Sequence, residues 1–87
     1  MLLRGTRLSE NSVKAYFLAI VKRGTEHVVA EKILKLEDVT DVLVTYGIWD
    51  IVARIETESL GKLDKIITEM RQFPEIEQTN TLVGGRQ

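Results

Sequence analysis

The chain has 87 residues, a net charge of −1 and no cysteine, which suits one small domain and excludes disulfide frameworks and cysteine-ligated zinc sites. Its 12 basic residues do not exceed its 13 acidic ones, so the basic excess typical of phosphate-gripping domains is missing and we expect no direct nucleic-acid binding. The first residues do not form a signal peptide and no apolar run approaches membrane-spanning length, so we expect a cytoplasmic protein without a membrane contact.

The small size itself favours self-association. A domain of this length buries only roughly 60–65% of the surface that its unfolded chain exposes, so its stability alone is marginal. Disulfides are not available as a remedy because the chain has no cysteine. A partner surface is the other common source of burial.

The first expected strand follows an irregular arm. Residues 1–14 show no sustained period and are interpreted as an arm or linker remnant, whereas residues 15–83 form the predicted domain and residues 84–87 a tail. Residues 15–21 (AYFLAIV) are apolar at odd and even positions alike. This pattern is typical of a central strand covered from both sides.

A helix and a hairpin come next. Thr25 is a suitable N-cap, and the apolar residues from Val28 to Leu36 recur at helical spacing. Residues 41–46 alternate as a half-buried strand, Gly47 interrupts them, and residues 50–56 form a third strand. Because the connection is short, the two strands are expected to pair as an antiparallel hairpin.

The last two elements are a second helix and a fourth strand. The helix has the clearest amphipathic stripe in the chain and ends at Pro74. Residues 76–83 then alternate polar and apolar side chains as a strand. The stripe consists of Leu60, Leu63, Ile66, Ile67, Met70 and Phe73.

The order βαββαβ predicts an α+β fold, a ferredoxin-like sandwich in which two helices cover one face of a four-stranded antiparallel sheet. The other face then has no cover of its own. In the first strand one apolar set packs under the helices, and the other lies bare in a monomer. A contiguous bare apolar face marks a protein–protein surface, so we expect dimerisation through this open face.

Signals for catalysis are weak. His27, the sole histidine, lies in a helical first turn without a nucleophile or paired acid nearby in sequence. One histidine with scattered carboxylates does not make a metal site, and no glycine loop precedes a helix. Arg54 is expected to pair with an acidic neighbour on the sheet or at an interface. We therefore predict no enzyme, no metal and no cofactor.

The hairpin tip contains the residues of this chain that are chemically best suited to contact a small ligand. Two interpretations of Gly47 and Asp50 remain open: ordinary turn chemistry, or a backbone that lets a small ligand approach while Asp50 accepts its ammonium group. On the last strand Gln78, Thr79 and Thr81 add amide and hydroxyl groups, although threonine is also a common strand residue.

The sequence resembles a known family at these positions. Residues 46–52 (YGIWDIV) resemble the glycine-x-x-aspartate hairpin of the Lrp/AsnC transcription regulators. Residues 73–81 (FPEIEQTNT) are similar to that family's second signature, a proline and an apolar residue leading into a threonine-rich last strand. The resemblance covers residues 15–83 and corresponds to the C-terminal effector domain, called the RAM domain.

The resemblance implies dimers made by packing two sheets face to face, rings of dimers, and amino-acid effector sites at the boundaries between dimers. It also implies which residues line such a site. An amino-acid zwitterion needs an acceptor for its ammonium group and donors for its carboxylate. By position, the lining residues are Tyr46, Gly47, Asp50, Gln78, Thr79 and Thr81.

One departure from the family pattern concerns DNA binding. Full-length members carry a helix-turn-helix before this domain, and the roughly fourteen residues before the first expected strand are too few for one. We therefore expect a stand-alone RAM protein, or an isolated domain, that acts by co-assembling with full-length Lrp/AsnC relatives or by sensing amino acids.

Several other interpretations share this topology. An ACT-type regulatory domain also has βαββαβ order and binds amino acids, and Gly24 is weakly compatible with it. A dimeric α/β-barrel enzyme requires a polar catalytic group in an apolar cavity, where His27 is badly placed. An RNA-binding module requires basic residues beside the aromatic residues of the central strands, and Tyr16 and Phe17 lack such neighbours. A ligand-free assembly domain also remains open.

Overall fold

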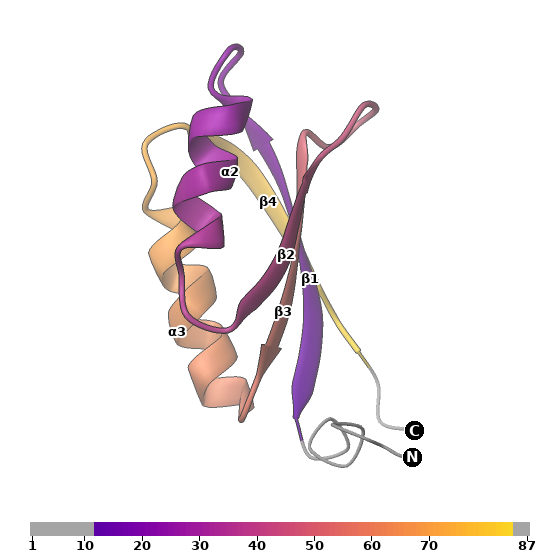
Figure 1. Ribbon diagram of the computed structural model, residues 1–87, viewed down its shortest axis with the longest axis vertical. Coiled ribbons are helices and arrows are strands. Elements are labelled where there is room, and N and C mark those ends of the chain that lie inside the picture. The colour runs from indigo at the N-terminus through magenta and orange to yellow at the C-terminus, as the bar shows by residue number, and fades with distance from the viewer. Residues whose placement is uncertain (1–11, 85–87) are drawn as a thin grey trace.

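Four strands and two helices follow one another in the order βαββαβ through residues 12–84, the part of the chain that the computed structural model describes. The sheet order is β2-β3-β1-β4 and all pairings are antiparallel. Both helices lie on the same face (Figure 1). The predicted ferredoxin-like fold is confirmed. The elements are β1 (Val13–Val21), α2 (Glu26–Leu34), β2 (Val39–Val44), β3 (Ile51–Thr57), α3 (Leu60–Arg71) and β4 (Ile76–Val83).

Alternation along β1 and β3 builds the core. In β1 the odd-numbered residues from Ala15 to Val21 are buried under the helices, and in β3 the residues from Ile51 to Thr57 repeat this pattern. Successive side chains of a strand point to opposite faces, so one set of each strand meets the helix layer. The largest fully buried side chains are those of Phe17, Ile33, Ile51, Ile55, Met70 and Val29.

The two helices differ in how they begin. Ser59 caps α3, since its hydroxyl oxygen accepts a hydrogen bond from the Lys62 N–H at 3.1 Å. Thr25 occupies the predicted N-cap position of α2, but its hydroxyl donates to the Lys22 carbonyl at 2.6 Å instead of capping the helix. Leu60 was expected on the apolar face of α3 and is 63% exposed at the helix start.

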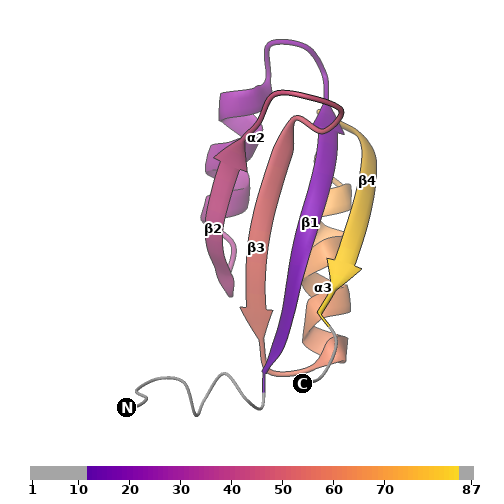
Figure 2. The ribbon, with the colours of Figure 1, turned by 90° about the vertical axis from the view of Figure 1, so that its right-hand side faces the viewer.

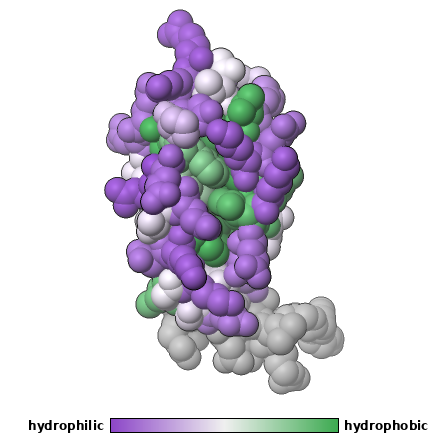
Figure 3. Space-filling view, turned by 90° about the vertical axis from the view of Figure 1, so that its left-hand side faces the viewer, coloured by the Kyte–Doolittle hydropathy of each residue, from purple (hydrophilic) through white to green (hydrophobic). Residues whose placement is uncertain are grey.

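The outer surface of the helix layer is mainly hydrophilic, with hydrophobic side chains along its central strip (Figure 3). Neither helix of the described chain is long and apolar enough to cross a membrane, since the longer, α3, has 12 residues.

The opposite face of the sheet carries a continuous apolar surface. Leu43, Val52 and Leu18 are aligned across three neighbouring strands, and Tyr16 pairs with Leu82 beside them. The helices lie behind the sheet in this view, so nothing within residues 12–84 covers this open face (Figure 2). This arrangement is the one predicted from the doubly apolar first strand.

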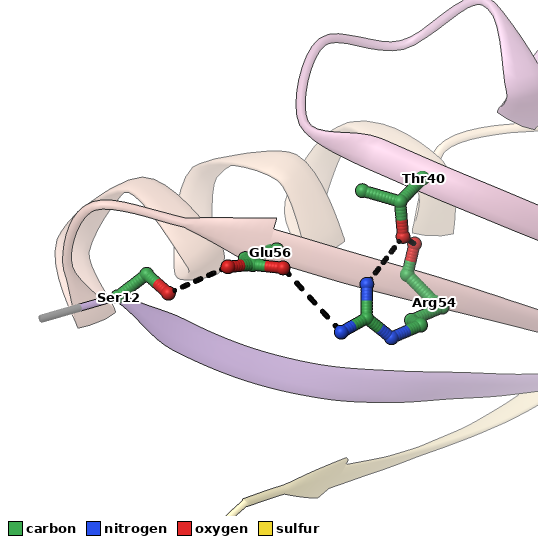
Figure 4. A network of polar contacts seen from close by, with 4 residues as sticks. All are labelled: Ser12, Thr40, Arg54 and Glu56. Carbon is green, nitrogen blue, oxygen red and sulfur yellow. Dashed lines mark hydrogen bonds and ion pairs between the residues drawn. The ribbon is translucent and has the colours of Figure 1, made fainter. Parts of the chain in front are cut away.

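A polar network borders the apolar surface at the β2–β3 side (Figure 4). The Arg54 guanidinium donates to the Thr40 hydroxyl at 2.9 Å and forms an ion pair with Glu56 at 3.4 Å. Glu56 also accepts a hydrogen bond from the Ser12 hydroxyl at 2.9 Å. The expectation that Arg54 pairs with an acidic neighbour on the sheet is confirmed.

Strand boundaries depart from the predicted ones. β1 begins at Val13, because Val13 and Lys14 pair with the end of β3 and so leave the predicted arm. β2 ends at Val44, which places Tyr46 in the connection instead of the strand. β3 begins after Asp50. Most of the predicted arm and tail, residues 1–11 and 85–87, lies outside the described residues.

One ion pair ties α2 to the turn before β4. Lys32 Nζ lies 2.9 and 3.0 Å from the two carboxylate oxygens of Glu75, and 5.3 Å from the centre of the Phe73 ring. The Glu75 carbonyl also accepts the Lys22 N–H at 2.9 Å. The hydrogen bond from Lys32, assisted by one from the Glu75 backbone, lowers the pKa of the Glu75 carboxyl from its ordinary value.

Replacing Glu75 with glutamine is expected to lower the thermal unfolding midpoint at pH 7. Since the folded pKa lies below the unfolded value of 4.5, this stabilisation is present above pH 4.5 and disappears as the pH falls through the folded pKa. Thermal scans from pH 7 to pH 3 should show the unfolding midpoints of wild type and Glu75→Gln converge as the pH falls. The same substitution in a Lys32→Met background should show no such convergence, and a constant difference at all pH values contradicts the assignment.

Candidate functional site

The β2–β3 connection is a short loop with an exposed tip. Two hydrogen bonds close it, from the Thr45 N–H to the Asp50 carbonyl at 2.8 Å and from the Thr45 hydroxyl to the Trp49 carbonyl at 2.6 Å. Gly47 has a φ of +135°, a conformation that side chains disfavour. Tyr46 beside it is fully exposed. The requirement for glycine here is conformational, because no atom lies within 4 Å of the position that a Gly47 side chain would occupy.

Asp50 joins this loop to the end of β1. Its N–H donates to the Ala19 carbonyl at 2.9 Å, and its Oδ2 accepts the Val21 N–H at 3.0 Å. The β1–β4 register shifts between Ile20 and Val21, and the Asp50 side chain accepts the Val21 backbone donor beside this shift. One carboxylate oxygen thus supports the backbone. Among the hydrogen bonds recorded within residues 12–84, none involves Oδ1.

Asp50 is one of the residues that line an open depression of about 420 Å³ at this end of the sheet. Three segments lie at this end of the sheet: the β1–α2 turn, the β2–β3 loop and the start of β4 (Figures 1 and 2). Three of its lining residues are acidic and one is an arginine, a composition that can supply acceptors for a cation and a donor group for an anion. Its lining residues are Val21, Arg23, Glu26, Asp50 and Glu77.

The predicted residues of β4 do not share one surface. Gln78 pairs with Ile20 of the open face, whereas Thr79 and Thr81 pair with Ala19 and Phe17 of the helix face. Because side chains alternate along a strand, Gln78 and the two threonines point to opposite sides of the sheet. The structure therefore brings Asp50 close to the start of β4 and separates Gln78 from Thr79 and Thr81.

Sequence reasoning did not identify Arg23, Glu26 or Glu77. Arg23 and Glu26 flank the turn after β1, which carries no motif. Glu77 lies at the start of β4 within the signature of residues 73–81, but it was not among the residues that the resemblance implied for the site. The predicted ferredoxin-like fold contains the signal that was missed, since the antiparallel sheet of this fold places the end of β1 and the starts of β3 and β4 at one end. His27 is exposed on α2, and residues 12–84 contain no group of three histidine or carboxylate side chains placed to hold a metal ion.

Known proteins resemble this chain over its described length. The family model described as the Lrp/AsnC ligand binding domain matches residues 14–84. The HTH-type transcriptional regulator FL11 of Pyrococcus abyssi is 31% identical over 72 residues, a match that covers 83% of this chain and 48% of that protein. The chain thus spans about half the length of the curated regulators it matches.

Solved structures with the same fold include chains of similar length. FFRP-DM1 is 38% identical with a TM-score of 0.80, and the match covers 84% of this chain and 99% of that one. The hypothetical protein PHS023 from Pyrococcus horikoshii is 37% identical with a TM-score of 0.81, covering 86% of this chain and 92% of that one.

Two substitutions of Asp50 test whether its side-chain oxygen stabilises the fold by accepting the Val21 N–H. Asp50→Ala removes the acceptor for the Val21 N–H and should lower the free energy of unfolding by about 1 kcal/mol, since water in the open depression replaces part of the bond. Asp50→Asn keeps an oxygen acceptor and should unfold close to wild type. Urea denaturation measures both, and equal stability of the alanine variant and wild type contradicts this role.

Proposed function

The chain belongs to the Lrp/AsnC ligand-binding domain family, and from this premise we propose that it is an amino-acid-binding and oligomerisation module of Lrp/AsnC-type transcription regulation. Its role is regulatory, not catalytic, as the names of its curated relatives suggest. The observation that carries the binding proposal is that Asp50, whose Oδ2 accepts the Val21 N–H, and Arg23 both line one depression.

The depression has the charge pattern that an amino-acid zwitterion requires. The ammonium group would donate to Asp50 Oδ1, with Glu26 and Glu77 adding negative charge, and the carboxylate would accept from Arg23. Charge-assisted hydrogen bonds of this kind contribute about 1.5–3 kcal/mol each. The surplus of carboxylates makes the ammonium group the main anchor.

The depression is too open to enclose a ligand by itself. Binding sites commonly bury at least about 70% of a small ligand, so a second subunit is needed to complete this one. The exposed tip residues Tyr46 and Ile48 lie at the same end of the sheet, in a position to contact a neighbouring dimer. A site shared between two subunits would also have room for Gln78 of one chain and Thr79 or Thr81 of the other.

Dimerisation would use the open sheet face. The row Leu43–Val52–Leu18, with Tyr16 and Leu82 beside it, forms an apolar patch that a second copy buries under two-fold symmetry. The same contact between homologous domains provides a route for co-assembly with Lrp/AsnC relatives. Rings of dimers complete the proposed assembly.

Ligand binding is tested by titration calorimetry against each of the common amino acids. One or a few should bind at one site per subunit, and Asp50→Asn should weaken binding at least about tenfold through loss of the charge-assisted bond. Asp64→Asn on the exposed side of α3 is the matched control and should bind as wild type. If wild type binds none of them, the domain assembles without an effector.

The dimer is tested by sedimentation of Leu18→Glu, which places a charge at the centre of the open face and should lower the native mass by separating the face-to-face dimer. Leu60→Glu makes the same change at the exposed start of α3 and should keep the wild-type mass. Circular dichroism checks that both variants fold. A monomeric wild type, or a Leu18→Glu variant that keeps the wild-type mass, refutes the proposed interface.

A further inference from the structure

The two edges of the sheet are built differently. A sheet edge presents unpaired backbone N–H and C=O groups to any extended chain that approaches it, and monomeric proteins block such edges with bulges, charges or prolines. β2 and β4 are the two edge strands here. Their comparison shows which edge is protected.

The β2 edge is blocked. The strand has six residues and its pairing with β3 shifts register between Val39 and Asp41. Asp41 adds a charge, and its Oδ1 accepts the Val42 N–H at 3.0 Å. Another chain therefore meets a short, irregular strand with one backbone donor already engaged.

The β4 edge lacks these features. From Gln78 to Val83 the strand contains neither a charged residue nor proline, and its pairing with β1 is regular over this stretch. The Gly84 N–H donates to the Lys14 carbonyl at 2.7 Å. Because the direction of backbone groups alternates along a strand, the backbone groups facing away from β1 are those of Thr79, Thr81 and Val83.

We propose that β4 is a second self-association surface, at which the β4 strands of two copies pair antiparallel and join their sheets edge to edge. A strand that pairs antiparallel with the same strand of a second copy obeys two-fold symmetry, so each contact between them occurs twice, once on either side of the axis. No strand lies beyond β4 within residues 12–84, and the outward backbone groups are in place to pair.

The side chains of β4 are compatible with self-pairing. With the symmetry axis at Asn80, the two Asn80 amides lie opposite each other and can exchange hydrogen bonds, and Thr79 lies opposite Thr81 of the second copy. Pairs of threonines across strands are favourable. Glu77, the one acidic residue of β4, then lies opposite Val83, so no two like charges meet.

This contact is separate from the open face. Face-to-face packing uses side chains of the sheet surface, whereas edge pairing uses backbone groups of β4. Two different two-fold contacts on one subunit link dimers into larger assemblies. The inference thus adds to the proposed function a second contact between dimers, made by the β4 backbone and distinct from the one at the β2–β3 loop tip, and it does not depend on the ligand.

The test combines hydrogen exchange with one substitution. In wild type, NMR-detected exchange of the Thr79, Thr81 and Val83 amides should be roughly a hundredfold slower than that of exposed amides, because opening requires dissociation of the strands. Thr81→Pro removes an outward N–H that has no partner in β1, a change that edge strands tolerate. It should reduce the native mass to the face-to-face dimer and abolish protection at Thr79. The control Thr81→Val keeps the N–H and should assemble as wild type.

The outcomes distinguish the two contacts. Rapid exchange of the three amides in wild type overturns edge pairing, whether or not the proline variant folds, and so does a Thr81→Pro variant with wild-type mass and protection. Leu18→Glu addresses the other interface, since it should leave β4-paired dimers with protected amides. If wild type is a dimer and Leu18→Glu reduces it to monomers whose β4 amides are unprotected, the open-face interface is supported and pairing of the β4 edges is refuted.

Discussion

The alternation of side chains along β1 is the constraint on which the rest of the structure depends. Phe17 and its odd-numbered neighbours fill the core beneath the helices, and Leu18 and its even-numbered neighbours face outward. A strand in the middle of the sheet that is apolar on both sides needs two covers. The chain supplies one cover with α2 and α3, and the proposed dimer supplies the other.

Asp50 connects this sheet to the candidate site. By accepting the Val21 N–H it holds the β2–β3 loop against the end of β1, and the same residue lines the depression. The turn interpretation and the ligand interpretation of this residue are therefore compatible. A ligand that engages Asp50 acts on the hydrogen bond between the loop and the central strand, and this gives binding a direct route to the geometry of the tip, where we expect neighbouring dimers to meet.

The fold was predictable from local pattern, and the site only in part. Helical periodicity, the break at Pro74 and the short connection around Gly47 identified the elements in order, although the β2 boundary was displaced because Thr45 and Tyr46 continue the alternation beyond the last ladder pair. Asp50 was identified through its motif. The other residues that line the depression were not predicted, because Arg23 and Glu77 lie on segments far apart in the chain and no spacing rule relates them.

The sequence by itself determined the element order, the family and the presence of two apolar sets on the first strand, because these follow from periodicity and from residues that are neighbours in the chain. Only the tertiary structure decided which set faces the helices, that Gln78 and Thr79 lie on opposite sides of the sheet, and that the Thr81 backbone points outward at an unblocked edge. These features depend on the register between strands, and register is set by pairing across the sheet between residues distant in sequence.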